Sequence, residues 1–154
     1  MELIVILNNI RSNENVGSIF RTADAAGVGK IILSGYTPTP LDKFGRVNKA
    51  LSKAALGAEK FVPWEKVKSF KGIIERLKKE RFKIVAVEQD KNSINYKLLS
   101  TDYNLAFVFG NEVTGLSKKD LLLCDLIAEI PMRGKKESLN VSVAAGIVLF
   151  GVGQ

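Results

Sequence analysis

The stretch "ESLNVSVAAGIVLFG", residues 137–151, predicts how the C-terminal part of the chain is built. From Val141 onward it is apolar on nearly every side, which is typical of a buried helix. Small polar residues precede it. Ser138 or Asn140 could cap the helix, whose free N–H groups could then meet a polar ligand. A buried strand is predicted just before, over Leu126–Ile130, so we expect a strand, a polar loop and a buried helix.

The same alternation of strands and helices continues toward the N-terminus. Short apolar runs predict strands over Leu3–Leu7, Lys30–Leu33, Phe61–Val62, Ile84–Val87 and Leu105–Phe109. Helical spacing of apolar residues predicts helices over Asn15–Ala26, Val47–Leu56, Val67–Glu80, Lys118–Leu123 and Val141–Phe150. This order implies an α/β fold with a mostly parallel sheet flanked by helices. We expect one domain over residues 1–154.

Composition excludes several classes of protein. The chain has no histidine and one cysteine, Cys124. It therefore lacks Ser-His-Asp and Cys-His catalysis and any zinc site that uses imidazole, and we expect no metal. A single thiol suits a reducing, cytoplasmic compartment. No apolar run approaches the roughly 18 residues of a membrane span. The net charge of +7 suggests an anionic partner, with nucleic acid the first candidate.

Three loops follow predicted strands, at the sheet edge where ligands bind in such folds. They are "VEQDKNS" (87–93), "GNEVTGLS" (110–117) and "PMRGKKESLN" (131–140). Gly110, directly after a strand, could let a ligand approach the backbone closely. No GxGxxG or Walker motif is present, which argues against the usual dinucleotide or ATP site. Ordinary turns and caps remain the alternative for any one loop.

Three longer segments carry a more specific signal. "NENVGSIFRTADAAGV" (13–28), "VFGNEVTGLS" (108–117) and "IPMRGKKESLNVSVAAGI" (130–147) resemble, in order, the signature motifs of the SpoU/TrmH family. Members of this family are RNA 2′-O-ribose methyltransferases of the SPOUT superfamily. The resemblance implies an enzyme that uses S-adenosyl-L-methionine, and a C-terminal trefoil knot that builds the cofactor pocket.

The resemblance also implies site residues. Cofactor-binding positions are Val87, Glu88, Gln89, Gly110, Asn111, Ile130, Met132, Ser138 and Leu139. Catalytic positions are Arg21, Asn15, Glu112, Ser138 and Asn140. Family members are proposed to activate the ribose hydroxyl through the arginine that matches Arg21. A guanidinium rarely gives up its proton, so Arg21 could instead hold a phosphate and stabilise the developing alkoxide.

Structural roles are the alternatives for three of these residues. Arg21 could form a surface pair with Asp24, three residues further along the helix. Glu112 could be a loop carboxylate near the helix that begins at Lys118, and Asn15 could cap its own helix.

The implied partner is RNA, either tRNA or rRNA. The sequence holds no additional RNA-binding domain, so we expect the catalytic domain itself to capture substrate. Two sets of cations could bind phosphates. One is dense in sequence: Lys66, Lys68, Lys71, Arg76, Lys78, Lys79, Arg81 and Lys83. The other lies near the motif loops: Arg46, Lys49, Lys53, Arg133, Lys135 and Lys136. A solvated helix face is the alternative for the first set, and we favour the second.

The apolar last helix and the family resemblance also predict a homodimer, in which Arg21 of one chain faces the cofactor site of the other. Two further functions remain open. One is a SPOUT methyltransferase that acts on a base nitrogen. The other is an RNA-binding protein without catalysis.

Overall fold

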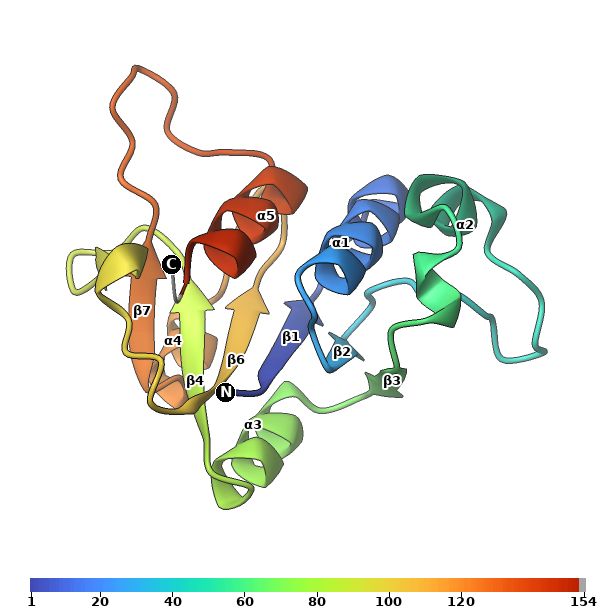
Figure 1. Cartoon of the computed structure of the whole chain (residues 1–154), viewed down its shortest axis with the longest axis horizontal. Helices are drawn as coiled ribbons and strands as arrows, with labels where there is room; N and C mark the ends of the chain where they lie inside the picture. Colours follow the sequence, from blue (N-terminus) through green and yellow to red (C-terminus); the bar gives the residue numbers. More distant parts are fainter. Residues whose placement is uncertain (153–154) are drawn as a thin grey trace.

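A seven-stranded sheet, in which every strand pairing is parallel, forms the centre of the computed structural model, which describes residues 1–152 (Figure 1). Its strands are β1 Leu3–Asn8, β2 Lys30–Ser34, β3 Trp64–Val67, β4 Phe82–Val87, β5 Ile94–Asn95, β6 Asn104–Phe109 and β7 Leu126–Glu129. Their spatial order is β3-β2-β1-β6-β4-β7-β5. The predicted α/β fold with a parallel sheet is confirmed.

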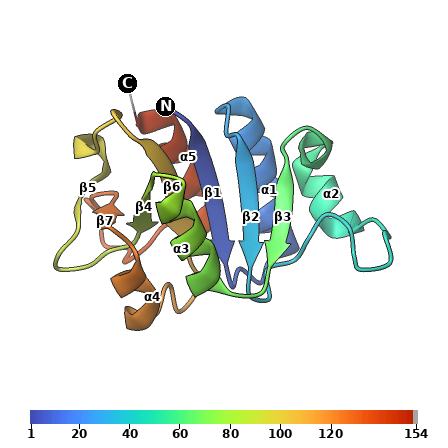
Figure 2. The same ribbon diagram turned by 90° about the horizontal axis from the view of Figure 1, so that it is seen from below.

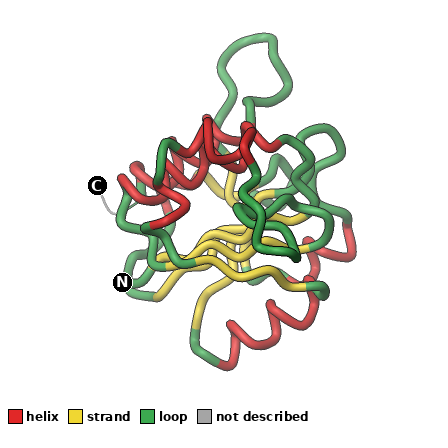
Figure 3. The backbone as a smooth tube through the Cα atoms, turned by 90° about the vertical axis from the view of Figure 1, so that its right-hand side faces the viewer, coloured by secondary structure: helices red, strands yellow, loops and turns green. Residues whose placement is uncertain are grey.

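Helices cover both faces of this sheet. They are α1 Asn13–Ala25, α2 Lys49–Ala55, α3 Phe70–Lys79, α4 Lys118–Leu123 and α5 Val141–Gly151. Two 3-10 turns add η1 Ala58–Lys60 and η2 Tyr96–Leu98. Side chains of α1, α2 and α5 share one buried cluster, and those of α3 and α4 belong to the other (Figure 2). Figure 3 shows the resulting three layers, with helices above and below the strands.

Two sequence predictions were wrong between residues 61 and 70. The strand expected at Phe61–Val62 lies instead at Trp64–Val67, and the helix expected from Val67 begins at Phe70. Ser69 explains the later start, because its side chain accepts a hydrogen bond from the Gly72 N–H and caps α3. Of the other boundaries, most agree within two residues. The two-residue strand β5 was not predicted.

The carboxyl ends of β6, β4 and β7 lie side by side, since these strands are neighbours in the sheet. The segments that follow them therefore meet at one edge. The long loop between β7 and α5 projects from this edge (Figures 1 and 3). Among residues 1–152, the structure contains no helix of the length and apolarity that a membrane span requires.

Candidate active site

The three predicted loops line a single open cavity of about 240 Å³ at the carboxyl edge of the sheet. The start of α5 closes its remaining side with Val141 and Ala144. Every residue predicted to bind a cofactor lies on this lining: Val87, Glu88, Gln89, Gly110, Asn111, Ile130, Met132, Ser138 and Leu139. The fold thus brings together segments more than 40 residues apart in sequence. Cofactor binding itself stays a prediction.

Gly110 and Gly115 shape the loop on the β6 side of the cavity. A Cβ at Gly110 would lie 2.7 Å from the backbone of Gly115 and Leu116, so the loop folds back where a side chain would be. The sequence-based reason for Gly110 was close approach by a ligand, whereas the structure gives close approach by the chain itself. Gly115 has φ +66° and faces the Glu88 carboxylate, which a Cβ there would overlap.

Glu88 fastens this loop to the end of β4. Its Oε1 accepts a hydrogen bond from the Leu116 N–H at 2.8 Å. Burial raises the pKa of Glu88, although the N–H groups of Leu116 and Gln89 act in the opposite direction. Glu88 therefore has a structural contact at the cavity wall, in addition to the cofactor contact predicted for it.

Glu112 connects the cavity to the start of α1. Its two carboxylate oxygens accept hydrogen bonds from the N–H groups of Arg11 and Ser12, at 3.0 and 2.9 Å, and from the Asn15 amide at 3.3 Å. Partial burial raises the pKa of Glu112, but these hydrogen bonds outweigh it and hold the pKa below its ordinary value. Glu112 is therefore a charged carboxylate at neutral pH. Its hydrogen bonds hold the segment before α1 and the Asn15 side chain against the cavity.

Asn15 joins the same network from the other direction. The Asn140 side-chain amide donates to Asn15 Oδ1 at 3.2 Å. Asn140 also caps α5, where its Oδ1 accepts from the N–H groups of Ser142 and Val143 at 2.8 and 3.3 Å. Three predicted catalytic residues from three motifs are thus connected. Ser12, rather than Asn15, caps α1, so the capping alternative for Asn15 was wrong.

Two predicted catalytic residues lie outside this network. Ser138 lines the cavity beside Leu139. Arg21 is exposed on α1 and lines no part of the cavity. Six residues separate it from Asn15, which corresponds to about 9 Å along the helix and a rotation of about 240°. None of the ion pairs among residues 1–152 involves Arg21, so the surface pair with Asp24 is not formed.

The charge of the cavity is opposite to that of the whole chain. Four carboxylates line it: Glu88, Glu112, Glu129 and Glu137. No lysine or arginine among the described residues lines it. The chain as a whole carries +7. Such a lining favours a cationic or neutral ligand over a polyphosphate. No group of three or more histidine, cysteine, aspartate or glutamate side chains within residues 1–152 is arranged to hold a metal ion.

The two sets of cations differ in their contacts. In the 66–83 set, Lys66 donates to two loop carbonyls, and Lys71, Arg76 and Lys78 form ion pairs. These contacts favour a structural role for much of the first set. Arg133, Lys135 and Lys136 are exposed on the loop beside the cavity, outside the ion pairs formed by the described residues.

The sheet and the three loops define the class of the protein: a parallel α/β domain with a candidate ligand site at the carboxyl ends of its strands. Within this class, the chain belongs to the SpoU rRNA methylase family, whose sequence model matches residues 2–150. A TrmH-family protein of Staphylococcus haemolyticus, named for tRNA/rRNA methylation, is 34% identical over 152 residues. That alignment covers 99% of this chain and 58% of the relative. The chain therefore spans little more than half the length of the curated relatives it matches.

Solved structures show the same similarity. An rRNA methyltransferase from Sinorhizobium meliloti with bound AdoMet superposes with a TM-score of 0.88 and 30% identity, over 97% of this chain and 55% of that one. A TrmH/SpoU tRNA-modifying enzyme from A. aeolicus gives 0.84 and 33%, over 97% and 73%. The sequence prediction of the SpoU/TrmH family is confirmed.

Proposed function

We propose that the protein transfers a methyl group from S-adenosyl-L-methionine to a ribose 2′-hydroxyl of RNA. The observation that carries this proposal is the acidic cavity at the meeting point of the three motif loops. Family membership supplies the reaction class, and the AdoMet bound to the S. meliloti relative supplies the cofactor class. Specificity for ribose is supported by the third motif, residues 130–147.

The cavity suits this cofactor in shape and charge. Apolar side chains such as Val87, Ile130 and Leu139 provide surface for an adenosine, and the backbone around Gly110 provides polar groups. When bound, the cofactor supplies an activated methyl group on a positively charged sulfonium. The lining carboxylates attract that charge, whereas they would repel the phosphates of ATP or NAD.

The chain's own residues supply alignment and electrostatic stabilisation. Charged Glu112 fixes the start of α1, and Asn15 and Asn140 hold α1 and α5 in register at the cavity mouth. Ser138 presents a hydroxyl from the cavity wall. Positioning a ribose hydroxyl against the methyl donor can lower a barrier by several kcal/mol (about 7–11 in well-oriented systems). As the O–CH3 bond forms and the S–CH3 bond of the sulfonium breaks, the hydroxyl proton passes to solvent. Arg21 holds the substrate phosphate and stabilises the developing alkoxide.

Arg21 can fulfil this role if it acts on a second chain's cavity. It lies on a different side of α1 from Asn15, away from its own cavity. On the same layer, α5 exposes Val143 and Phe150 by 50% and 48%. We therefore propose a homodimer that covers these side chains and brings Arg21 of one chain to the other chain's cofactor. Mixing inactive Arg21→Ala chains with inactive Leu139→Trp chains, whose cavity is filled, should restore activity. A fully active monomer would contradict this arrangement.

We also propose that the C-terminal segment is threaded as a trefoil knot. The end of α5 packs against the segment before β6, since a Cβ at Gly151 would overlap the Tyr96 ring. Single-molecule stretching from both termini should give a contour length shorter than the unknotted chain by several residues. A full-length contour would exclude the knot. We also propose that the chain folds as one catalytic domain and acts in the cytoplasm.

The reaction class can be tested with purified protein, mixed RNA and methyl-labelled AdoMet in excess chelator. We expect label in RNA without added metal. Binding of AdoMet measured by calorimetry should persist under chelation and should exceed binding of ATP or NAD. RNA binding without transfer would instead support the non-catalytic alternative.

A further inference from the structure

The loop between β2 and α2 presents an aromatic ring among cations. Phe44 is 70% exposed at the tip of residues 41–47, which we call the Phe44 turn. The Lys43 ammonium and the Arg46 guanidinium lie 5.1 and 5.0 Å from the ring centroid. Lys49 and Lys53 follow, both exposed and one turn apart on α2. Residues 42–53 thus carry four cations and one carboxylate.

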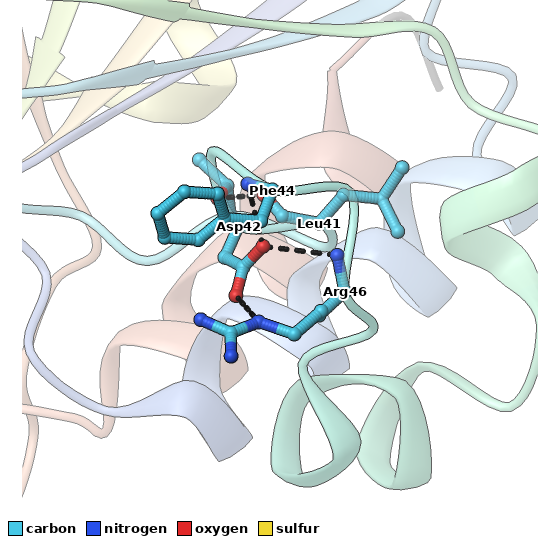
Figure 4. Close-up of polar contacts among 5 residues, drawn as sticks. Leu41, Asp42, Phe44 and Arg46 are labelled. Carbon is cyan, nitrogen blue, oxygen red and sulfur yellow. Dashed lines mark hydrogen bonds and ion pairs between the residues drawn. The ribbon is translucent and has the colours of Figure 1, made fainter.

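The Phe44 turn is held in one shape by its single carboxylate (Figure 4). Asp42 accepts hydrogen bonds from the N–H groups of Phe44 and Arg46 at 2.8 and 2.9 Å, and from Arg46 Nε at 2.7 Å. The Asp42 N–H donates to the Arg46 carbonyl at 2.9 Å, and Leu41 pairs with Val47 across the base. None of these hydrogen bonds involves the Phe44 ring, which stays exposed to solvent. The ring therefore projects from a turn whose backbone is fixed by hydrogen bonds.

Both ends of the loop are anchored as well. At its start, the Lys66 ammonium donates to the carbonyls of Gly35 and Thr37, each at 2.6 Å. At its end, the Asn48 amide donates to Asn13 Oδ1 at 2.7 Å, two residues before Asn15 of the proposed active site. The end of the loop is therefore hydrogen-bonded to the start of α1. Figure 1 places it beyond α2, on the side of α2 that faces away from α1 and α5.

We propose that the Phe44 turn is a stacking platform for an unpaired base of the RNA substrate, with Lys43, Lys49 and Lys53 holding the adjoining phosphates. An aromatic ring beside a guanidinium stacks on the π-face of any base, and clustered cations follow the backbone. This platform gives the domain a second hold on RNA outside its acidic cavity. A second copy of the chain is disfavoured as the occupant, because two such cationic patches would repel each other.

This inference rests on the proposed function. Measuring RNA binding in the absence of AdoMet tests the platform separately from methyl transfer. The probe is a fluorescein-labelled 20-nucleotide single-stranded poly(U), compared with a fully paired RNA duplex. Phe44→Ala should weaken binding of the single strand about 5- to 100-fold, as one lost base–aromatic stack implies. It should change duplex binding less than twofold. Phe44→Leu should behave like alanine, and Phe44→Tyr should retain affinity.

Two controls make the result decisive. Phe61 is 73% exposed and lacks a cation over its ring among the contacts of the described residues, so Phe61→Ala should leave binding within twofold. AdoMet affinity should be unchanged in both variants. Equal binding by wild type and Phe44→Ala, retained binding in Phe44→Leu, or dissociation of a dimer in Phe44→Ala would overturn the platform. Failure of the wild-type protein to bind any RNA would overturn the proposed function itself.

Discussion

Replacing Glu112 by glutamine tests how the cavity is tied to α1. The glutamine keeps the size of the side chain but removes its charge and turns one acceptor oxygen into a donor. One of the bonds from Arg11 or Ser12 is then lost, and those that remain become neutral. Hydrogen bonds to charged groups contribute about 1.5–3 kcal/mol, and the lower part of this range applies because Glu112 is partly exposed. We expect a loss of about 2 kcal/mol in the free energy of unfolding at pH 7.

The pH dependence of this loss has a definite sign. The folded-state pKa of Glu112 lies below its unfolded value of about 4.3. The charged carboxylate therefore stabilises the fold fully above that unfolded pKa, and the contribution disappears as the pH falls through the folded pKa. The difference between wild type and Glu112→Gln should consequently shrink in acid.

Urea unfolding at one fixed protein concentration, at pH 7 and at several values below 5, measures both effects. The matched control is Glu137→Gln, which changes an exposed carboxylate of the same cavity and should shift stability by less than about 0.5 kcal/mol. Equal stability of Glu112→Gln and wild type at pH 7, or a difference that grows in acid, would refute this reasoning.

Three further predictions concern the candidate site, and a fourth concerns the thiol of Cys124 at the end of α4. Asn140→Ala removes the cap of α5 and should cost about 1 kcal/mol in thermal or urea unfolding. Gly110→Ala meets the returning backbone and should cost about 1–3 kcal/mol, with loss of AdoMet binding by calorimetry. Arg21→Ala should lower turnover by orders of magnitude while AdoMet affinity stays within a few-fold, and Arg21→Lys should rescue poorly. Burial raises the pKa of Cys124 to about 12, so a thiol reagent at pH 8 should label it far faster in urea than in the folded protein.

Much of the fold was predictable because its elements have distinct hydrophobic periods. The four long buried strands β1, β2, β4 and β6 stand out as apolar runs, and Asn140 caps α5, as one of the two predicted alternatives. The error at β3 arose because Trp64–Val67 places two charged residues side by side between two apolar ones, so this edge strand shows neither an apolar run nor a period of two. A cap such as Ser69 fixes the first residue of a helix only once the N–H group that it accepts from is known.

Sequence reasoning grouped residues that the fold brings to one cavity, but it did not predict the contacts among them. The residues predicted to bind a cofactor all line one cavity, although cofactor binding by them stays a prediction. Motif resemblance could not show that Glu112 accepts the backbone N–H groups ahead of α1, because that contact joins positions 100 residues apart. Nor could sequence alone show that Lys66 supports a loop instead of a phosphate, since both uses require only an exposed-looking lysine.

We propose that this acidic cavity directs a methyl group onto a ribose oxygen of RNA. The most direct test uses AdoMet with a deuterated methyl group, incubation with RNA, and digestion of the product to nucleosides. Mass spectrometry then locates the heavy methyl on either the sugar or the base fragment. We predict that the label lies on the ribose and is lost with Arg21→Ala. Label on a base nitrogen, or none transferred by an intact protein that binds both AdoMet and RNA, would contradict the account.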